Sequence, residues 1–519
     1  MQLYKFSLLF LLSILVVVVL NLPENFDTTF NWSYPVLNFD LSFRILLISF
    51  LSAAFLIVLP AKNLSFSEML SFFAYTISSL CAILSKQILL AVIFCELMAI
   101  SASFIIAAGS KDNGPAVRYA CVHFFVGVVL TAGLAIQSSN LIIIGLLINC
   151  ACFPFSFWVV DTYPAASLHG ASYLSLFTTK ISFLVALLHT YNLWQDYSEI
   201  LAFLGTITAI YGIIFASLEQ NIRRFLAYSV VGQMGILIMT GSLLSRLENA
   251  VPLLALNIIF SIAYQLLLIA VANSIILRTK VVNFNRASKF MSVEGMYALI
   301  AILTMAAFPG TAGFISKSYI AAEIKMNGTD LELYENLHKI LNLLLYLSVG
   351  LKFLYYIFVA KSKSKPSAEE GSGIAMIILA FICVIVGNPY LPIYNKPAIF
   401  NLAYNTQNIW SQFSSLLCAT LLFISLRKLF LPRINFKMDI DWIFRALIPY
   451  VVSLFNKLAF KMRKISASVL QNLTNSLTSL YSNNTTKLKE VLSYNSVSFV
   501  SASSLFLMSV LLVLLCLNH

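Results

Sequence analysis

The sequence predicts an all-α polytopic membrane protein with about 14 to 15 transmembrane helices. Of its 519 residues, 60% are hydrophobic and only 10% are charged, and the mean hydropathy is +0.89. A soluble domain carries roughly a quarter charged residues. The apolar residues also form runs of about 18 to 25 residues, and such a run crosses a hydrocarbon layer of about 30 Å as a helix.

The expected spans follow one another with short connections. They are residues 3–20, 37–60, 64–84, 88–108, 117–137, 139–160, 167–191, 199–218, 225–245, 251–277, 293–323, 340–360, 373–391, 408–431 and 498–517. The first span follows Lys5 and resembles a signal peptide, but Asn21-Leu-Pro-Glu24 offers no small-residue cleavage site. We therefore expect it to be an anchor.

Basic residues gather in alternate connections, which predicts the orientation. With the N-terminus inside, the inner connections hold Lys62, Lys111, Arg118, Arg223, Arg224, Arg278, Lys280, Arg286, Lys289, Lys361, Lys363, Lys365, Arg427, Lys428, Arg433 and Lys437, with Asp161 as the exception. Acidic residues mark the opposite side. The net charge of +12 is thus a topology signal, and without a basic recognition motif it does not indicate nucleic-acid binding.

Five regions are expected along the chain. Residues 1–87 form N-terminal transmembrane helices, 88–360 a core, 361–440 further transmembrane helices, 441–497 a basic amphipathic helix with a polar linker, and 498–519 a final anchor. The 441–497 region also fits an ordinary solvated linker. There is no phosphate-binding glycine loop, dinucleotide fingerprint or iron–sulfur cysteine cluster, so we expect no cofactor and no metal.

Three charged residues inside predicted spans are candidate functional residues. Glu96 and Lys180 lie far from the ends of their spans, and Lys317 follows a Pro309-Gly310 break in an apolar segment. A buried charge is costly in a membrane, so it pairs, takes up a proton or lines water. A broken helix exposes backbone groups that need a polar cavity or protein contacts. Each residue could alternatively form a structural ion pair or extend to the membrane surface.

Three sequence blocks resemble one known family. Pro154-Phe-Ser-Phe-Trp158 with Asp161-Thr-Tyr-Pro-Ala-Ala166 is similar to its Pro-Phe-His-x-Trp-Leu-Pro-Asp-Ala-His-Pro-Ala-Ala segment. Two further blocks, residues 221–235 and 308–317, resemble its Asp-Ile-Lys-Arg-Leu-Leu-Ala-Tyr-Ser-Ser…Gln-Met-Gly and Pro-Pro-Leu-Ala-Gly-Phe-Phe-Ser-Lys segments. The family comprises antiporter-like proton-channel subunits. These are the D-type subunits of Mrp-type cation/proton antiporters and the M, N and L subunits of the complex I membrane arm.

The resemblance implies a fold and a set of site residues. It implies two inverted five-helix repeats, each with a discontinuous helix. It also implies that Glu96, Lys180 and Lys317 correspond to the family's buried glutamate, mid-channel lysine and exit-side lysine. His169 follows the first block and is a further candidate for the proton path, or alternatively a hydrogen-bonded structural histidine.

The sequence departs from the family at three positions. The lysine that partners the buried glutamate is replaced by Asn149, and the histidine and lysine of a His-Ala-Phe-Phe-Lys-Ala-Leu-Leu block become Ser261 and Gln265. Amides form hydrogen bonds but do not carry protons at neutral pH. We therefore hypothesise a shortened path in which Glu96 and Lys180 load protons and Lys317 releases them.

Several functions remain open at this stage. The chain could be a subunit of an Mrp-type Na⁺/H⁺ antiporter, a membrane-arm subunit of a complex I-like NADH:quinone oxidoreductase, or a non-conducting structural paralogue. The segment Met438-Asp-Ile-Asp-Trp-Ile-Phe-Arg445 favours the antiporter weakly, because some Mrp-type members carry a similar tail. A self-contained enzyme would need a catalytic cluster, and the five histidines are scattered. We expect other membrane subunits as partners, in a bacterial inner membrane.

Overall fold

The structure is a computed structural model that describes most of the chain. The described residues are 2–21, 41–61, 64–110, 112–246, 250–284, 292–326, 332–359, 373–391 and 403–427, with 450, 453 and 460. The chain divides into two compact units, Met1–Asp441 and Trp442–His519. The predicted amphipathic helix and linker (441–497) and the final anchor (498–519) lie outside the described residues, apart from the isolated positions 450, 453 and 460.

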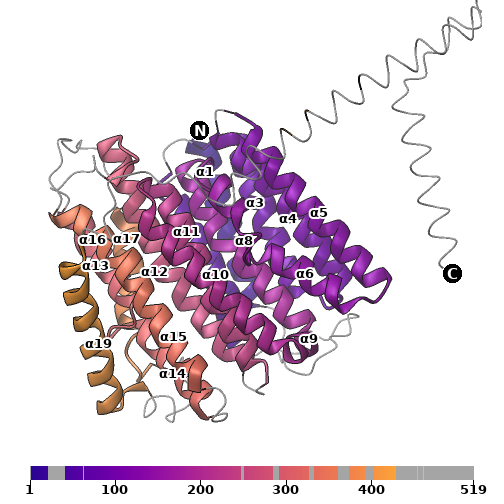
Figure 1. Ribbon diagram of the computed structural model, residues 1–519. Helices are drawn as coiled ribbons and strands as arrows, with labels where there is room; N and C mark the ends of the chain where they lie inside the picture. Colours follow the sequence, from indigo (N-terminus) through magenta and orange to yellow (C-terminus); the bar gives the residue numbers. More distant parts are fainter. Residues whose placement is uncertain are drawn as a thin grey trace, which may run out of the picture. The chain divides into compact units, whose positions relative to one another are not determined.

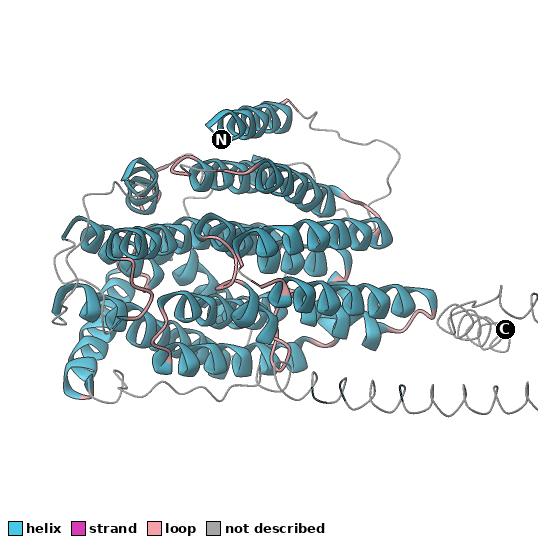
Figure 2. Cartoon of the chain, turned by 90° about the horizontal axis from the view of Figure 1, so that it is seen from above, coloured by secondary structure: helices cyan, strands magenta, loops and turns pink. Residues whose placement is uncertain are grey.

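The first unit is built from helices, which confirms the all-α prediction. The helices lie side by side along most of their length (Figure 1) and are joined by loops (Figure 2). Their bounds are α1 Gln2–Leu20, α2 Leu41–Val58, α3 Phe66–Leu84, α4 Ile88–Gly109, α5 Gly114–Ala135, α6 Ser139–Asn149, α7 Phe157–Thr162, α8 Leu168–His189, α9 Tyr191–Asp196, α10 Ser198–Leu218, α11 Ile222–Leu244, α12 Ala250–Thr279, α13 Ser292–Met305, α14 Ala312–Met326, α15 Glu332–Leu345, η3 Tyr346–Leu351, α16 Lys352–Leu354, η4 Tyr355–Val359, α17 Gly373–Ile385 and α19 Thr406–Ser425.

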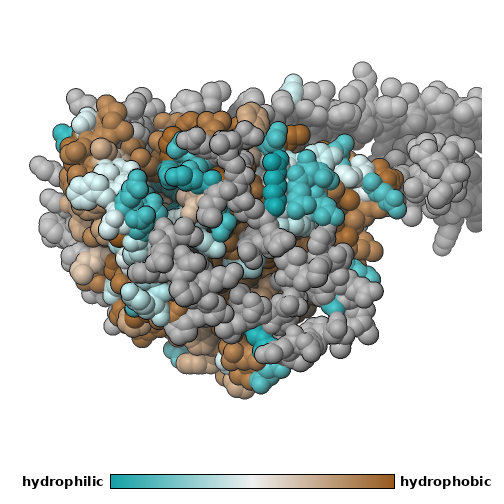
Figure 3. All heavy atoms as spheres, turned by 90° about the horizontal axis from the view of Figure 1, so that it is seen from below, coloured by the Kyte–Doolittle hydropathy of each residue, from teal (hydrophilic) through white to brown (hydrophobic). Residues whose placement is uncertain are grey.

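Many of these helices can span a membrane. In the described part of the chain, ten helices are long and apolar enough to do so, and four shorter apolar helices accompany them. α8 and α11 are almost entirely buried within the protein, whereas large apolar side chains such as Phe104 and Phe203 are exposed on other helices. On the face drawn in Figure 3, hydrophilic side chains gather in patches beside apolar ones. The protein is therefore an integral, multi-pass membrane protein.

The α10–α11 hairpin is the most tightly packed pair of helices, because glycines bring the two backbones together. A Cβ atom added to Gly212 would lie 2.3 Å from the backbone nitrogen of Gly232. One added to Gly235 would lie 2.2 Å from the backbone nitrogen of Ala209. Small residues allow this close approach in membrane helices, where packing rather than hydrophobic exclusion holds helices together. The hairpin is thus a rigid support for the residues it carries.

The predicted continuous span at 139–160 is wrong, because the helix breaks in its second half. α6 ends at Asn149, and the chain continues through Ala151, whose φ is +56°, to the short α7. Pro154 supports the break, since proline has no N–H for a helical hydrogen bond. The Phe153 backbone N–H instead donates to Thr208 Oγ1 at 2.9 Å. The irregular backbone is therefore covered by α10, as backbone at membrane depth requires.

The predicted break at Pro309-Gly310 is confirmed. α13 ends at Met305 and α14 begins at Ala312, so the apolar segment 293–323 forms two helices rather than one. Ala307 and Gly310 have φ values of +57° and +89°, which a continuous helix does not allow. The chain therefore contains two broken apolar segments, one on each side of the α10–α11 hairpin in the sequence.

The helix predicted at 340–360 begins earlier and is not a regular α-helix. It starts at Glu332 and passes through two π-helical stretches, Tyr346–Leu351 and Tyr355–Val359. A π-helical stretch rotates the following side chains relative to an α-helical register, and it occurs often at functional sites. Here the first stretch turns Lys352 toward the interior of the protein.

Candidate functional site

A polar cavity lies in the interior of the helical core. It has a volume of about 30 Å³ open to water-sized molecules, enough for about two of them. Five helices line it, α8, α11, α12, α14 and α15. Its polar lining residues are Lys180, Gln233, Asn257, Ser261, Gln265, Lys317, His338 and Asn342. The structure thus brings together four of the residues selected from the sequence: Lys180, Lys317, Ser261 and Gln265.

Lys180 is held at one side of the cavity by a chain of polar side chains. It is 2% exposed, and its Nζ donates to the Ser175 backbone oxygen at 3.1 Å and to Gln265 Oε1 at 2.5 Å. Gln265 Nε2 in turn donates to Gln233 Oε1, and Gln233 Nε2 donates to Ser229 Oγ at 3.2 Å. Gln265, which the resemblance aligns with a family lysine, is therefore a direct hydrogen-bond partner of Lys180.

The amide chain orients Lys180 but does not carry a proton onward. Each glutamine accepts through its amide oxygen and donates through its amide nitrogen, and neither group takes up or releases a proton at neutral pH. The other neighbour of Lys180 is the cavity that it lines. Water bridging polar groups is suited to carrying a proton onward, and the cavity lies directly beside the lysine.

Lys317 lies at the broken helix, as its position after the break predicts. It is 8% exposed, and its Nζ donates to the backbone oxygen of Met305, the last residue of α13. The last carbonyls of a helix have no partner within it and carry partial negative charge. The break thus supplies a site for an ammonium group, and the Tyr264 ring lies beneath it at 5.6 Å.

Sequence reasoning missed two further residues of the cavity, His338 and Asn342. Both lie on α15, and Asn342 Nδ2 donates to the His338 backbone oxygen at 2.8 Å. His338 is 3% exposed and shares the cavity with Lys317. The predicted span began at residue 340, which placed His338 in a loop. An apolar stripe with i, i+3 and i+4 spacing already begins near residue 333 and was the available signal.

Glu96 lies outside the cavity, on α4 beside α5. Its carboxylate lies against Gly127, where an added Cβ would be 2.4 Å from Oε1. Asn149, the residue in place of the family's lysine, is buried and bonds to His123 of α5 rather than to Glu96. The described ion pairs do not join Glu96 to Lys180. The proposed exchange between them therefore needs at least one intermediate group.

His169 and Ser261 occupy different places. His169 lies in the first turn of α8, where it contacts the backbone of Ile57 in α2, away from the cavity lining. Ser261 lines the cavity, and its hydroxyl donates to the Ile258 backbone oxygen at 2.7 Å. Its oxygen still accepts hydrogen bonds from the cavity side.

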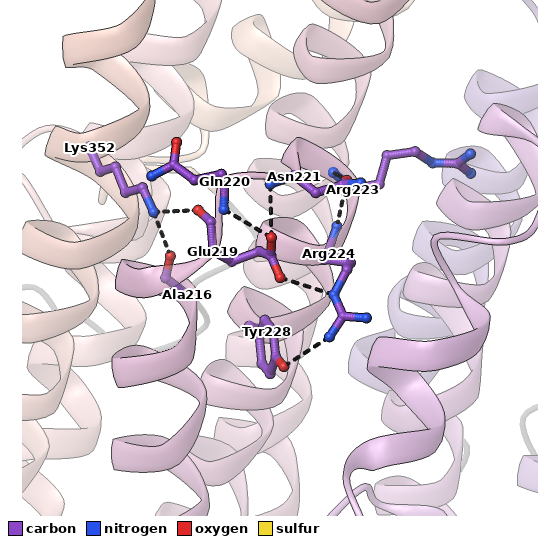
Figure 4. Close-up of polar contacts among 8 residues, drawn as sticks. All are labelled: Ala216, Glu219, Gln220, Asn221, Arg223, Arg224, Tyr228 and Lys352. Atoms are coloured by element: carbon purple, nitrogen blue, oxygen red, sulfur yellow. Dashed lines mark hydrogen bonds and ion pairs between the residues drawn. The ribbon is translucent and has the colours of Figure 1, made fainter. Parts of the chain in front are cut away.

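Lys352 is a further buried lysine. It also lies in an apolar span, but it was not among the candidates selected from the sequence. It is 0% exposed, and its Nζ donates to the backbone oxygens of Ala216, Ser217 and Glu219 at 2.9, 2.7 and 2.6 Å. Figure 4 shows the contacts with Ala216 and Glu219. The three acceptors are carbonyls at the C-terminal end of α10. Because all three ammonium protons have acceptors, Lys352 is a helix cap and not a free carrier.

The turn between α10 and α11 completes this cluster. Glu219 Oε1 accepts from the backbone N–H groups of Gln220 and Asn221, both at 2.9 Å, and Glu219 Oε2 pairs with Arg224 at 2.9 Å (Figure 4). Asn221 caps α11 through its side chain, and Arg224 reaches Tyr228 at 3.4 Å. Part of the second family-like block therefore has a structural role, which fixes the end of the hairpin that carries Gln233.

These features define a class of protein: a polytopic helical membrane protein with two broken helices and an internal cavity lined by two buried lysines. Comparisons agree with that class. Residues 125–331 match the family described as "NADH:quinone oxidoreductase/Mrp antiporter, TM". A curated relative, NADH-quinone oxidoreductase subunit N of Geotalea uraniireducens, is 26% identical over 288 residues, covering 53% of this chain and 59% of that protein. The chain thus spans little more than half the length of this relative.

Solved structures share the fold. The Mrp complex from Dietzia sp. matches with a TM-score of 0.70 and 15% identity, over 92% of this chain and 60% of that one. Respiratory complex I from Thermus thermophilus matches with a TM-score of 0.61 and 16% identity, over 74% of this chain and 92% of that one. The resemblance to antiporter-like membrane subunits, recognised from three sequence blocks, is therefore confirmed.

Proposed function

We propose that the chain is a membrane subunit that moves protons, or exchanges monovalent cations for protons, within a multi-subunit complex of a bacterial inner membrane. The observation that carries this proposal is the cavity between Lys180 and Lys317. Two buried ammonium groups are costly in a membrane and are usually retained for ion movement. Both reach a space that admits water, and neither is paired with a carboxylate among the described ion pairs.

The proposed path runs from Glu96 toward Lys180, across the cavity to Lys317 and His338. Gln265 and Gln233 hold Lys180 in place, and the orphan carbonyl of Met305 holds Lys317. His338 lines the same cavity as Lys317, so a bridging water can connect the lysine to α15. His169 stays a weaker candidate, because it does not line the cavity.

Two parent complexes fit this function, each favoured by one observation. Curated relatives such as that of Geotalea uraniireducens carry the name of a quinone oxidoreductase subunit, which favours a redox-driven complex. The Mrp structure matches more of this chain, 92% against 74%, which favours a cation/proton antiporter. In either complex, electron transfer would be carried by other subunits.

Proton flux in vesicles tests the proposal. Membrane vesicles are prepared from a host that carries the full chain in its native complex, and flux is followed with a pH-sensitive dye. We expect Lys180→Gln to reduce driven flux to the level of vesicles without the chain, because the substituted side chain cannot hold a proton. Lys325→Gln is the matched control, since Lys325 is exposed at the end of α14.

The outcomes separate the alternatives. Glu96→Gln is expected to reduce flux as well, and wild-type flux in this variant would remove Glu96 from the path. Full flux in a correctly assembled Lys180→Gln complex would contradict the proposed function. If vesicles with and without the wild-type chain showed the same flux, the chain would instead be a structural paralogue.

A further inference from the structure

His123 is a buried histidine that the path described above does not use. It lies on α5 and is 4% exposed, and its Nδ1 is 3.0 Å from Asn149 Oδ1. Because an amide oxygen only accepts hydrogen bonds, Nδ1 is assigned as the protonated nitrogen. In the neutral ring, Nε2 then carries a free lone pair. This atom is buried and has no hydrogen-bond partner among the described residues.

Glu96 contacts the same helix one turn from His123. Its carboxylate rests against Gly127, which is four residues after His123 and therefore on the same face of α5. One helical turn separates the two positions, about 6 Å along the axis. A side chain at position 127 would displace the carboxylate from this place, so Gly127 makes room for Glu96 against α5.

Asn149 connects this pair to the altered family position. The family resemblance places a lysine there as the partner of the buried glutamate. In this chain Asn149 occupies that position. It cannot carry a proton, but its side chain orients the imidazole of His123. A histidine on a neighbouring helix can thus supply the titratable group that the asparagine cannot.

The imidazole of His123 packs among aromatic side chains. The rings of Tyr119 and Trp158 lie 4.2 and 4.7 Å from that of His123, centroid to centroid. Other ionisable groups around this part of α5 are Cys95 of α4 and Tyr163 beyond α7. Tyrosine and cysteine are neutral at pH 7 by their ordinary chemistry, so Glu96 is the group here that can give up a proton at that pH.

We propose that His123, oriented by Asn149, replaces the family's lysine as the proton-accepting partner of Glu96. A proton passes from the Glu96 carboxyl to His123 Nε2, directly or through one water, which leaves a carboxylate and an imidazolium. No electrons move and no other reactant is needed. This inference rests on the proposed function, for which it supplies an intermediate group between Glu96 and the cavity.

The first test measures the protonation of Glu96 without requiring conduction. Dicyclohexylcarbodiimide labels protonated carboxyls in apolar surroundings, and mass spectrometry quantifies labelled Glu96 in the purified native complex at fixed pH. We expect His123→Gln to increase labelling several-fold, because the carboxyl loses its proton acceptor. Adding Asn149→Lys to His123→Gln should return labelling to the wild-type level, since it restores the family's own cation.

His189→Gln is the matched control, because His189 is another histidine in the core but lies at the far end of α8. It should leave Glu96 labelling unchanged. Equal labelling in wild type and His123→Gln would overturn the inference. Increased labelling that Asn149→Lys does not reverse would also overturn it, since that result indicates local disorder instead of a lost cation.

The second test uses flux and separates this inference from the proposed function. We expect His123→Gln to lower proton flux and the double variant with Asn149→Lys to recover it. Wild-type flux in His123→Gln, together with loss of flux in Lys180→Gln, would overturn only the role of His123. Should wild type conduct no protons, the proposed function fails, and the labelling test still decides whether the two residues share a proton.

Discussion

At the scale of single residues, buried lysines in this protein differ in how fully their protons are bound. Lys352 donates three hydrogen bonds to the carbonyls that end α10, whereas Lys180 donates to one carbonyl and one amide beside a cavity. A saturated ammonium stabilises a helix end, and an ammonium beside a cavity can exchange its proton. Burial alone therefore does not identify a proton carrier.

Replacement of Lys352 by methionine tests the structural assignment. We expect Lys352→Met to lower the free energy of unfolding by about 3 kcal/mol, because buried carbonyls that lose their partner keep the cost of desolvation. Thermal unfolding of the purified protein in detergent measures the change. Lys325→Met removes an exposed lysine and should change stability by less than about 0.5 kcal/mol. Equal stability of the two variants would contradict the cap.

At the scale of elements, the two helix breaks decide where polar groups can lie. The break before α14 frees the Met305 carbonyl, which accepts a hydrogen bond from Lys317. At the break after α6, the Phe153 N–H donates to the Thr208 side chain instead of to a helix carbonyl. Arg223 of α11 also donates to the backbone oxygens of Ala166 and Ser167, between α7 and α8. The breaks are thus held by neighbouring helices, which keeps their irregular backbone away from lipid.

Gly310 allows a test of the second break. Its φ of +89° suits glycine, and an added Cβ would meet no atom within 4 Å, so backbone strain is the only cost of substitution. We expect Gly310→Ala to reduce stability by about 1 kcal/mol in thermal unfolding. Gly373→Ala is the matched control, because Gly373 also has open space but lies in the first turn of α17. It should be neutral or slightly stabilising.

If Gly310→Ala were as stable as its control, the chain would not need the left-handed conformation at the break. The same pair of variants can be assayed for proton flux. If Gly310→Ala lost flux and Gly373→Ala kept it, proton movement through Lys317 would depend on where the break places the Met305 carbonyl.

At the scale of the whole molecule, the exposed apolar helices fit both lipid and neighbouring subunits. Purification of the tagged native complex in mild detergent, followed by mass spectrometry, is expected to recover other membrane subunits with the chain. Flavin and iron–sulfur subunits would identify a redox-driven complex, and small antiporter subunits would identify a cation/proton exchanger. Recovery of the chain alone, under conditions that keep related complexes intact, would contradict a multi-subunit function.

The sequence by itself determined the membrane class, the approximate positions of most described helices and the break at Pro309-Gly310. Hydrophobic length and proline–glycine chemistry are local properties, so a single stretch of sequence reveals them. It also selected Lys180 and Lys317, because a charge in an apolar run is visible without any fold.

Only the tertiary structure decided how these residues are partnered. Gln265 is the partner of Lys180 although 85 positions separate them, and His123 meets Asn149 across two helices. The same holds for Lys352, whose acceptors lie more than 130 positions earlier in the chain. Whether a buried polar group is capped, oriented or free depends on neighbours from distant helices, and their relative rotation is set by packing that no local pattern encodes.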